Sequence, residues 1–176
     1  MNRAILKPRI SHLAKINSKA RIFGKVFISD NVYIGQSQVV STGKHTISIG
    51  KDSIVRDLVS IIAIDSVAAH LKHDINKVSD IYIGNKVFIS SEVLIEGPTL
   101  ISDGVFIGKN TKIINSKIGS NCVIENEVLI KDVVIPSNTF IPKKSEIDSN
   151  EKLKSLILRN NNGDYCEYNY SNVKAS

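Results

Sequence analysis

The sequence has few of the residues that build several common kinds of site. Its 176 residues include two cysteines, four histidines and four prolines, and no tryptophan. Two cysteines, Cys122 and Cys166, are too few for a disulfide framework or a cysteine-rich zinc site. No run of eighteen apolar residues is present, and the start MNRAILKPRI has too short an apolar core for a signal peptide. We therefore expect a soluble cytoplasmic protein without a transmembrane segment, although the acidic-poor start is also compatible with a mitochondrial address.

The charge pattern does not predict a nucleic-acid partner. Lysine and arginine exceed aspartate and glutamate by six charges, and clusters of basic residues are the usual footprint of phosphate binding. Here the basic residues are scattered along the chain with acidic residues between them, and no series of aromatic residues accompanies them. Such a pattern indicates a solvated surface, on which exposed lysines also discourage strand edges from pairing with other chains.

What the sequence has in abundance is regularly spaced isoleucine. In IYIGNKVFISSEVLIEGPTLISDGVFIGKNTKI, residues 81–113, an isoleucine recurs every six residues, at Ile83, Ile89, Ile95, Ile101, Ile107 and Ile113. This period matches neither a helix, which repeats every 3.6 residues, nor a half-buried strand, which repeats every two. Hexapeptide repeats are typical of a parallel β-helix, in which stacked coils bury a continuous apolar column. We therefore predict that these isoleucines point inward.

The repeat extends in both directions and is interrupted at a few places. Earlier inward positions are Ile10, Ile16, Ile22, Ile28, Ile34 and Val40, followed after a step of nine residues by Ile49, Val55 and Ile61. Later ones are Ile118, Ile124, Ile135 and Ile141, with one-residue slips near Asn115 and Val133. Glycine follows several of them, as expected if the chain turns a tight corner there. The predicted β-helix spans residues 1–147, with an excursion near 67–80.

A helix and a polar tail are predicted after the last coil. The stretch 148–162 has a helix N-cap at Asp148, Ser149 or Asn150, and Gly163 lies just past its end. Its apolar stripe is expected to pack along one face of the β-helix or onto a neighbouring subunit. Residues 163–176 contain three tyrosines without a clear period, so their place is left open.

Two stretches resemble the γ-class carbonic anhydrases, particularly the archaeal type. They are ARIFGKVFISDNVYIGQSQVVS and residues 81–142, and the resemblance runs roughly from residue 16 to 158. It includes the nine-residue step after Val40, the slip between Ile113 and Ile118, and the closing VIPSNTFIP. The resemblance implies a left-handed, triangular β-helix that forms trimers, with its C-terminal helix alongside. It also implies one zinc between neighbouring subunits, held by two histidines from one subunit and a third from the next.

The histidines of that family are not kept at the matching positions. The paired histidines, which precede Gly-Pro in the family, fall on Ser91 and Glu96, and the earlier histidine falls on Ile62. A serine hydroxyl is a poor zinc ligand, isoleucine offers none, and Glu96 alone cannot build a tetrahedral site. Asp57 matches an interface aspartate of the family, with Arg56 beside it, so this pair is an interface candidate.

The four histidines of the chain offer one further metal hypothesis. His12 and His45 are expected in solvated, outward or loop positions. His70 and His73 lie in AAHLKHD with the i, i+3 spacing of two ligands on one helical turn. A shift of eight residues in the alignment would also match His70 to the first histidine of the family. His70, His73 and Glu96 are therefore metal candidates, and a surface or interface role for the histidines is the competing interpretation.

Three functional hypotheses remain open from the sequence. The first is a γ-carbonic-anhydrase-like protein with a degenerate active site and no cofactor, serving as a structural or assembly subunit. The second is a zinc-dependent carbonic anhydrase with displaced ligands, and the third is a hexapeptide acyltransferase, which needs a histidine base. Enzymatic activity is thus undecided, and under the second hypothesis it would be that of a carbonate dehydratase. The expected partners are copies of this chain in a homotrimer, or γ-carbonic anhydrase paralogues in a heterotrimer or a larger complex.

Overall fold

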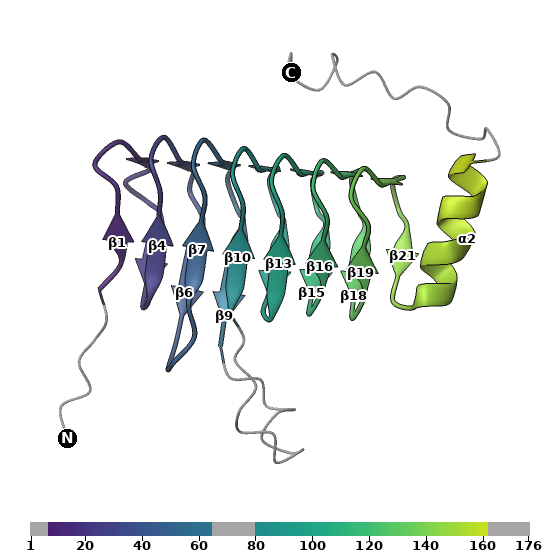
Figure 1. The fold of residues 1–176 in the computed structure, drawn as a ribbon. Coiled ribbons are helices and arrows are strands. Elements are labelled where there is room, and N and C mark those ends of the chain that lie inside the picture. Colours follow the sequence, from purple (N-terminus) through teal and green to yellow (C-terminus); the bar gives the residue numbers. More distant parts are fainter. Residues whose placement is uncertain (1–6, 65–79, 162–176) are drawn as a thin grey trace.

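The chain folds into a left-handed parallel β-helix of triangular cross-section, closed at one end by a helix (Figure 1). The computed structural model describes residues 7–64 and 80–161, with side chains up to Leu156. Each coil contributes one short strand to each of three parallel, seven-stranded sheets. The all-β fold class predicted from the hexapeptide period, with a C-terminal helix, is confirmed.

The three sheets form the faces of the prism, and we call them sheets A, B and C. Sheet A contains β1 (Arg9–Ile10), β4 (Val26–Ile28), β7 (Ile47–Ile49), β10 (Ile81–Ile83), β13 (Thr99–Ile101), β16 (Lys117–Ile118) and β19 (Val134–Ile135). Sheet B contains β2 (Lys15–Ile16), β5 (Tyr33–Ile34), β8 (Ile54–Val55), β11 (Phe88–Ile89), β14 (Phe106–Ile107), β17 (Val123–Ile124) and β20 (Phe140–Ile141). Sheet C contains β3 (Arg21–Phe23), β6 (Gln38–Ser41), β9 (Ser60–Ala63), β12 (Leu94–Glu96), β15 (Lys112–Ile114), β18 (Leu129–Lys131) and β21 (Glu146–Ile147).

The predicted isoleucines form the core of this prism. Residues that are no more than 1% exposed include Ile34, Ile49, Ile83, Ile89, Ile95, Ile101, Ile107, Ile113, Ile118, Ile124, Ile135 and Ile141. Full burial of one such side chain contributes roughly 1.5–3 kcal/mol, so the stack carries much of the stability. The first coil is different, because Ile10 is 43% exposed at the open end of the column.

One predicted inward position is wrong. Val40 is half-buried on the outside of β6, and Val39 takes the inward place instead, fully buried between Ile22 and Ile61 of the neighbouring coils. The step from Ile34 to Val39 is therefore five residues. Valine occupies both positions, so the sequence offers no contrast between an inward and an outward side chain there.

The glycines that follow the inward isoleucines also have a different physical role from the one predicted. Gly84 does not have a positive φ; the left-handed residue of that corner is Lys86, with φ of 55°. A Cβ on Gly84 would lie 2.3 Å from Oδ1 of Asp103 and 2.8 Å from the backbone of the next coil. Glycine is needed at this corner because the coils approach closely, and the turn itself is made two residues later.

Helix α2 (Asn150–Asn161) closes the end of the column at β21. The backbone N–H of Lys152 donates to the hydroxyl of Ser149 at 3.3 Å, which identifies Ser149 as the N-cap among the three predicted candidates. Leu153 is 6% exposed and joins the core, with Leu156 packed against it. Figure 1 shows α2 beyond β21 at the end of the prism. The apolar stripe covers the end of the column, which neither predicted location included.

Across the ranges with assigned structure, no helix has the length and apolarity needed to cross a membrane.

Candidate functional site

Two of the positions derived from the family resemblance lie side by side on the outside of sheet C. Ile62 on β9 and Glu96 on β12 are paired in register, and the backbone N–H of Gly97 donates to the carbonyl oxygen of Ile62 at 3.2 Å. The preceding residues, Ile61 and Ile95, are 0% exposed, so strand alternation turns Ile62 and Glu96 outward. Both side chains are half-buried.

The surroundings of Glu96 are apolar. Its two cross-strand neighbours on sheet C are Ile62 on β9 and Ile114 on β15, both half-buried. Val40 continues the same row beyond Ile62. A single carboxylate between two isoleucines offers a metal one oxygen-bearing group, whereas a tetrahedral zinc site needs three protein ligands and an open position. On this alignment, the residues present do not fit a zinc centre.

Ser91 lies at the opposite edge of sheet C from Glu96. It belongs to the turn before β12, where its carbonyl oxygen accepts the backbone N–H of Asn110 at 3.1 Å. Ser91 belongs to the turn that begins this face, where Glu92 has a φ of 62°, and Glu96 is the last residue of β12, so the two side chains stand at opposite ends of the face. One subunit therefore cannot bring Ser91 and Glu96 to the same ligand, and only a second chain could place a Ser91 near this Glu96.

Arg56 and Asp57 lie at the same edge of the prism as Ser91, in the turn between β8 and β9. The backbone N–H of Glu92 donates to the carbonyl oxygen of Asp57 at 3.2 Å, so the two turns are stacked. Oδ1 of Asp57 accepts the backbone N–H of Gln36 from the preceding coil at 2.7 Å. Asp57 thus links two coils within one chain, and this contact gives it a structural role in addition to the interface role expected from the sequence.

The histidines are distributed differently from the prediction. His12 is exposed in the turn between β1 and β2, as expected. His45 is 0% exposed, so the expectation of a solvated position was wrong. Its backbone N–H donates to the carbonyl oxygen of Thr42 at 3.2 Å, and its carbonyl oxygen accepts the hydroxyl of Ser41. His45 continues the inward alternation of Ile47 and Ile49, and that period of two was the missed signal.

The metal hypothesis based on His70 and His73 falls outside the described residues. Within residues 7–64 and 80–161, no group of three or more histidine, cysteine, aspartate or glutamate side chains could hold a metal ion. Glu96 is therefore the only one of the three metal candidates whose surroundings can be described.

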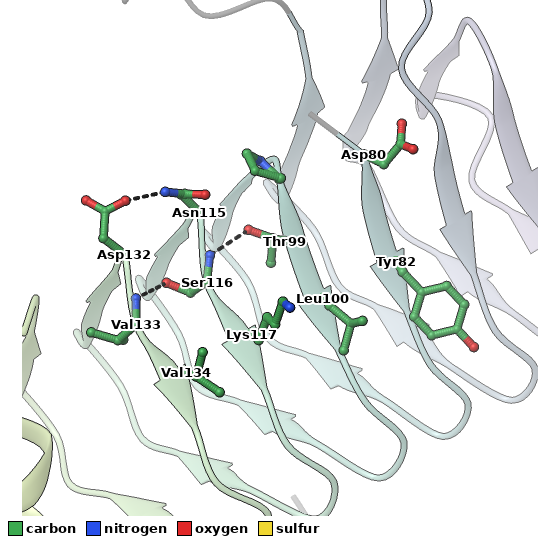
Figure 2. Close-up of a pocket in the computed structure, with 11 residues that line it drawn as sticks. Asp80, Tyr82, Thr99, Leu100, Asn115, Ser116, Lys117, Asp132, Val133 and Val134 are labelled. Atoms are coloured by element: carbon green, nitrogen blue, oxygen red, sulfur yellow. Dashed lines mark hydrogen bonds between the residues drawn. The ribbon is translucent and has the colours of Figure 1, made fainter. Parts of the chain in front are cut away.

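A shallow pocket that the sequence did not predict lies on sheet A, next to the corner that follows Glu96 (Figure 2). Its volume is about 320 Å³, and its lining includes Asp80, Tyr82, Pro98, Leu100, Lys117 and Val134. Pro98 follows a cis peptide bond. Figure 2 shows Tyr82, Leu100, Lys117 and Val134 side by side on neighbouring strands.

The polar groups of this pocket mostly bind the protein itself. Asp80 accepts the backbone N–H of Thr46 at 2.6 Å, and Asp132 accepts the side-chain amide of Asn115. Ser116 links the same two coils as the Asn115–Asp132 pair, because its hydroxyl accepts the N–H of Val133 at 3.3 Å. No histidine or cysteine lines the pocket, so its lining supplies neither an imidazole base nor a thiol nucleophile.

Comparison with curated proteins finds two similar sequences. The chain is 29% identical to the carbonic anhydrase of Methanosarcina thermophila over 157 residues, which are 85% of this chain and 64% of that protein. It is 26% identical to the carboxysome assembly protein CcmM of Nostoc sp. over 156 residues, which are 88% of this chain and 28% of that protein. The chain thus spans less than two thirds of either relative, and no protein-family model matches it. The resemblance to γ-class carbonic anhydrases is confirmed.

Solved structures show the same fold. A hexapeptide transferase family protein from Anaplasma phagocytophilum is similar with a TM-score of 0.67 and 16% identity, over 89% of both chains. A UDP-N-acetylglucosamine acyltransferase from Bacteroides fragilis is similar with a TM-score of 0.64 and 18% identity, over 80% of this chain and 54% of the other. At these identities the likeness describes the fold alone, because one fold supports many activities.

Proposed function

We propose that this protein is a γ-carbonic-anhydrase-like protein that lacks the usual zinc site and acts as a structural or assembly subunit of a trimer. The observation that carries the proposal is the pairing of Ile62 with Glu96. These two positions are neighbours on one subunit, as the family's shared site requires, yet together they offer one carboxylate. With Ser91 as the third position, no imidazole is supplied to a metal.

The fold does not depend on these three residues. The inward face of β9 and β12 is formed by Ile61, Ala63 and Ile95, all 0% exposed, and these residues pack in the core whatever stands on the outer face. A subunit that has lost its metal ligands therefore retains the hydrophobic stabilisation of the column. Such a protein is suited to a role in which shape and surface matter more than catalysis.

Assembly with other chains is part of the proposal. Ser91 and Glu96 lie at opposite edges of sheet C, so a site that combines them has to be built from two subunits. One of the two similar curated proteins is named as a carboxysome assembly protein, which supports an assembly role. The subunits are either copies of this chain or paralogues that carry the histidines.

The decisive experiment measures metal, activity and mass on the same sample. Protein purified without added zinc is analysed by inductively coupled plasma mass spectrometry, stopped-flow CO₂ hydration and light scattering. We expect a trimer with far less than one zinc per chain and no hydration above the uncatalysed rate. One zinc per chain, with hydration that His70→Ala abolishes, would instead establish the displaced-ligand carbonic anhydrase. Subunit analysis of the native complex distinguishes a homotrimer from a heterotrimer.

A gain-of-ligand variant tests the residue assignment itself. The variant I62H/S91H/E96H supplies imidazoles at all three positions, and we expect it to bind about one zinc per subunit interface. The matched control I62A/S91A/E96A changes the same positions without adding ligands. If the histidine variant remains a trimer but binds no more zinc than the control, the three positions do not form a shared site.

The acyltransferase hypothesis has less support among the described residues. His45 is buried in the core, so it cannot act as a base toward a ligand on the surface, and His12 is exposed at the open end of the column. A thermal-shift measurement with acetyl coenzyme A tests it, and a concentration-dependent rise in melting temperature would favour the acyltransferase.

A further inference from the structure

The net positive charge of the chain comes entirely from its first 29 residues. They contain seven lysines and arginines and no aspartate or glutamate, whereas residues 30–176 contain 16 basic and 17 acidic side chains. The scatter of basic among acidic residues therefore holds for the rest of the chain but not for its start. Five of these cations are exposed on the first coil, at Lys7, Arg9, Lys15, Lys19 and Arg21. Within the described part of the chain, none of the five forms an ion pair.

This basic coil is also the open end of the prism. Figure 1 shows β1 at the end opposite α2, and β1, β2 and β3 are each the last strand of their sheet. The backbone N–H groups of Lys15 and Arg21 donate to carbonyl oxygens of the second coil at 2.8 and 2.9 Å. Residues of a parallel strand bond alternately to its two sides, so Ile16 and Ile22 direct their N–H and C=O groups toward the open end. Within residues 7–64 and 80–161, no strand pairs with that side.

Apolar side chains are exposed at the same end. Ile10 is 43% exposed, Leu13 is 49% exposed, and Phe23, on the outer face of β3, is 52% exposed. Protein-binding surfaces commonly combine apolar residues at the centre with polar and charged residues around them. The first coil has this composition, and its charges are all of one sign.

A groove with a volume of about 700 Å³ lies beside the open end, on sheet C at its corner with sheet B. It is lined by Lys19 and Arg21 from the first coil and by Gln36, Gln38 and Ser60 from the next two. Nε2 of Gln38 donates to Oγ of Ser60 at 2.8 Å, so these two side chains bind each other. None of the described lining residues is acidic. The two cations only donate hydrogen bonds, so an anion fits the groove, and a carboxylate accepts two parallel bonds from an arginine.

We propose that the open end binds an acidic polypeptide segment in extended form. The segment pairs with the free edge of β3 at Ile22 and places carboxylates on Lys19 and Arg21. Outward residues alternate along a strand, so an acidic residue beside Arg21 is followed, two residues away, by an apolar residue beside Phe23. Addition of a strand to a free sheet edge is a common mode of peptide recognition, in which the backbone supplies affinity and alternate side chains supply specificity.

The free strand edge favours a polypeptide over other anionic partners. A polypeptide backbone offers both donors and acceptors to the edge, whereas nucleic-acid phosphates offer acceptors only. A lipid surface would leave the backbone groups of Ile16 and Ile22 without partners. A second copy joined through its own open end would bring like charges together. Residues 1–6 contain one arginine and no acidic residue, so they do not supply the complementary charge either.

The first coil is separate from the positions compared with the family's zinc ligands, because Ile62 and Glu96 lie on later coils. The inference therefore goes beyond the proposed function and does not rest on it. A chain with or without zinc can bind an acidic segment at its open end, and the affinity for that segment is measured separately from metal content and CO₂ hydration.

A peptide-binding measurement on the full chain tests the charge complementarity. The probe is a fluorescein-labelled, twelve-residue peptide of glutamates with one central valine, and fluorescence anisotropy is followed at low salt, where charges are least screened. We expect K15E/K19E/R21E to weaken binding by about tenfold or more. The matched control K112E/K117E/K131E reverses three exposed lysines of later coils and should weaken binding by less than about threefold. Equal losses for the two variants, or no binding to the unmodified protein, would overturn the inference.

A second probe tests the strand pairing on the unmodified protein, so it does not depend on how the variants fold. The same peptide, N-methylated at every residue, keeps its charge and length but has no backbone N–H to donate. We expect it to bind several-fold more weakly. Equal affinity of the two peptides would show that carboxylates alone hold the ligand, which would contradict strand addition at β3.

The other occupants are distinguished in parallel. A DNA oligonucleotide of equal charge and vesicles containing phosphatidylserine are titrated under the same conditions. Tighter binding of either than of the peptide, lost in K15E/K19E/R21E, would overturn the inference and assign the open end to nucleic acid or to a membrane. Light scattering tests a second copy, because an assembly of the unmodified protein that K15E/K19E/R21E abolishes would assign the open end to contacts between copies.

Discussion

The inward and outward side chains of the same strands are constrained in different ways. On β9 and β12, the inward Ile61 and Ile95 are 0% exposed and belong to a column of nearly uniform composition. One residue further along each strand, Ile62 and Glu96 point outward, and one is an aliphatic side chain whereas the other carries a carboxylate. The inner side is constrained by packing in all coils, whereas each outer residue is constrained only by its local use. Stability should therefore follow the inner side, and function the outer side.

The sharpest test of this comparison changes two adjacent residues. Ile95→Ala leaves a cavity between neighbouring coils, and we expect it to lower the free energy of unfolding by about 2–5 kcal/mol. Glu96→Ala changes the outer side of the same strand and should alter the free energy by no more than about 0.5 kcal/mol. Urea unfolding followed by circular dichroism measures both. Similar losses of unfolding free energy for the two variants would show that outward side chains stabilise the fold as much as inward ones.

The same division explains what could be predicted from the sequence. The isoleucine column was predictable because a period of six persists over many coils and matches no other backbone. Val40 was misplaced because its neighbour Val39 is also valine. His45 was misplaced because it is a polar residue in a loop, which usually indicates exposure. Its alternation with the inward Ile47 and Ile49 was the signal that indicated burial.

The outer side was less predictable, because hexapeptide repeats constrain only inward residues. The resemblance to γ-class carbonic anhydrases indicated which outward positions to compare. The structure places Ile62 beside Glu96, whereas Ser91 lies at the far edge of the sheet. The amphipathic stripe of α2 predicted an apolar face but not the surface it covers, since a helical period identifies a buried face without identifying its partner. The pocket on sheet A arises from residues of several coils and has no local signature.

Corner glycines are a second place where the inner packing can be broken. Gly84→Ala puts a Cβ 2.3 Å from Oδ1 of Asp103 and 2.8 Å from the next coil's backbone. We expect a loss of about 1–3 kcal/mol, because the coils have to separate locally. Thermal unfolding measures the change. Asp103→Ala alone is the reference for the double variant, because Asp103 also accepts the backbone N–H of Asn85. Gly84→Ala should still lower stability in that background, since the backbone contact remains, and no loss there would assign the strain to the carboxylate alone.

Asp57 tests whether an outward side chain can matter for stability. Its carboxylate accepts the backbone N–H of Gln36, so Asp57→Ala should cost about 0.5–1.5 kcal/mol in urea unfolding. Arg56→Ala, beside it, is the control and should change the unfolding free energy by less than about 0.5 kcal/mol. If the pair also lies at an interface of the proposed trimer, both variants should weaken that assembly on dilution. A variant of Asp57 with unchanged stability but a weaker trimer would assign the residue to the interface alone.

The smallest predicted effect concerns Asp30, a half-buried residue that links the first two coils. The hydroxyl of Ser11 donates to Oδ1 of Asp30 at 2.6 Å, and this hydrogen bond, with the nearby Lys51 ammonium, holds the pKa of Asp30 below its usual value of 3.8. Because the pKa is lowered in the folded state, the contribution to stability is present above the unfolded pKa and disappears as the pH falls through the folded pKa.

Ser11→Ala should therefore raise the pKa of Asp30, whereas Ser11→Thr, which keeps a hydroxyl, should leave it nearly unchanged. Carbon-13 NMR titration of the side-chain carboxyl reads this directly. At neutral pH Ser11→Ala should unfold at a slightly lower urea concentration than Ser11→Thr, and this difference should disappear as the pH falls through the pKa of Asp30. A pKa of Asp30 that stays low in Ser11→Ala would identify Lys51 as the main cause. Added salt should then raise the pKa of Asp30, because it screens the Lys51 charge.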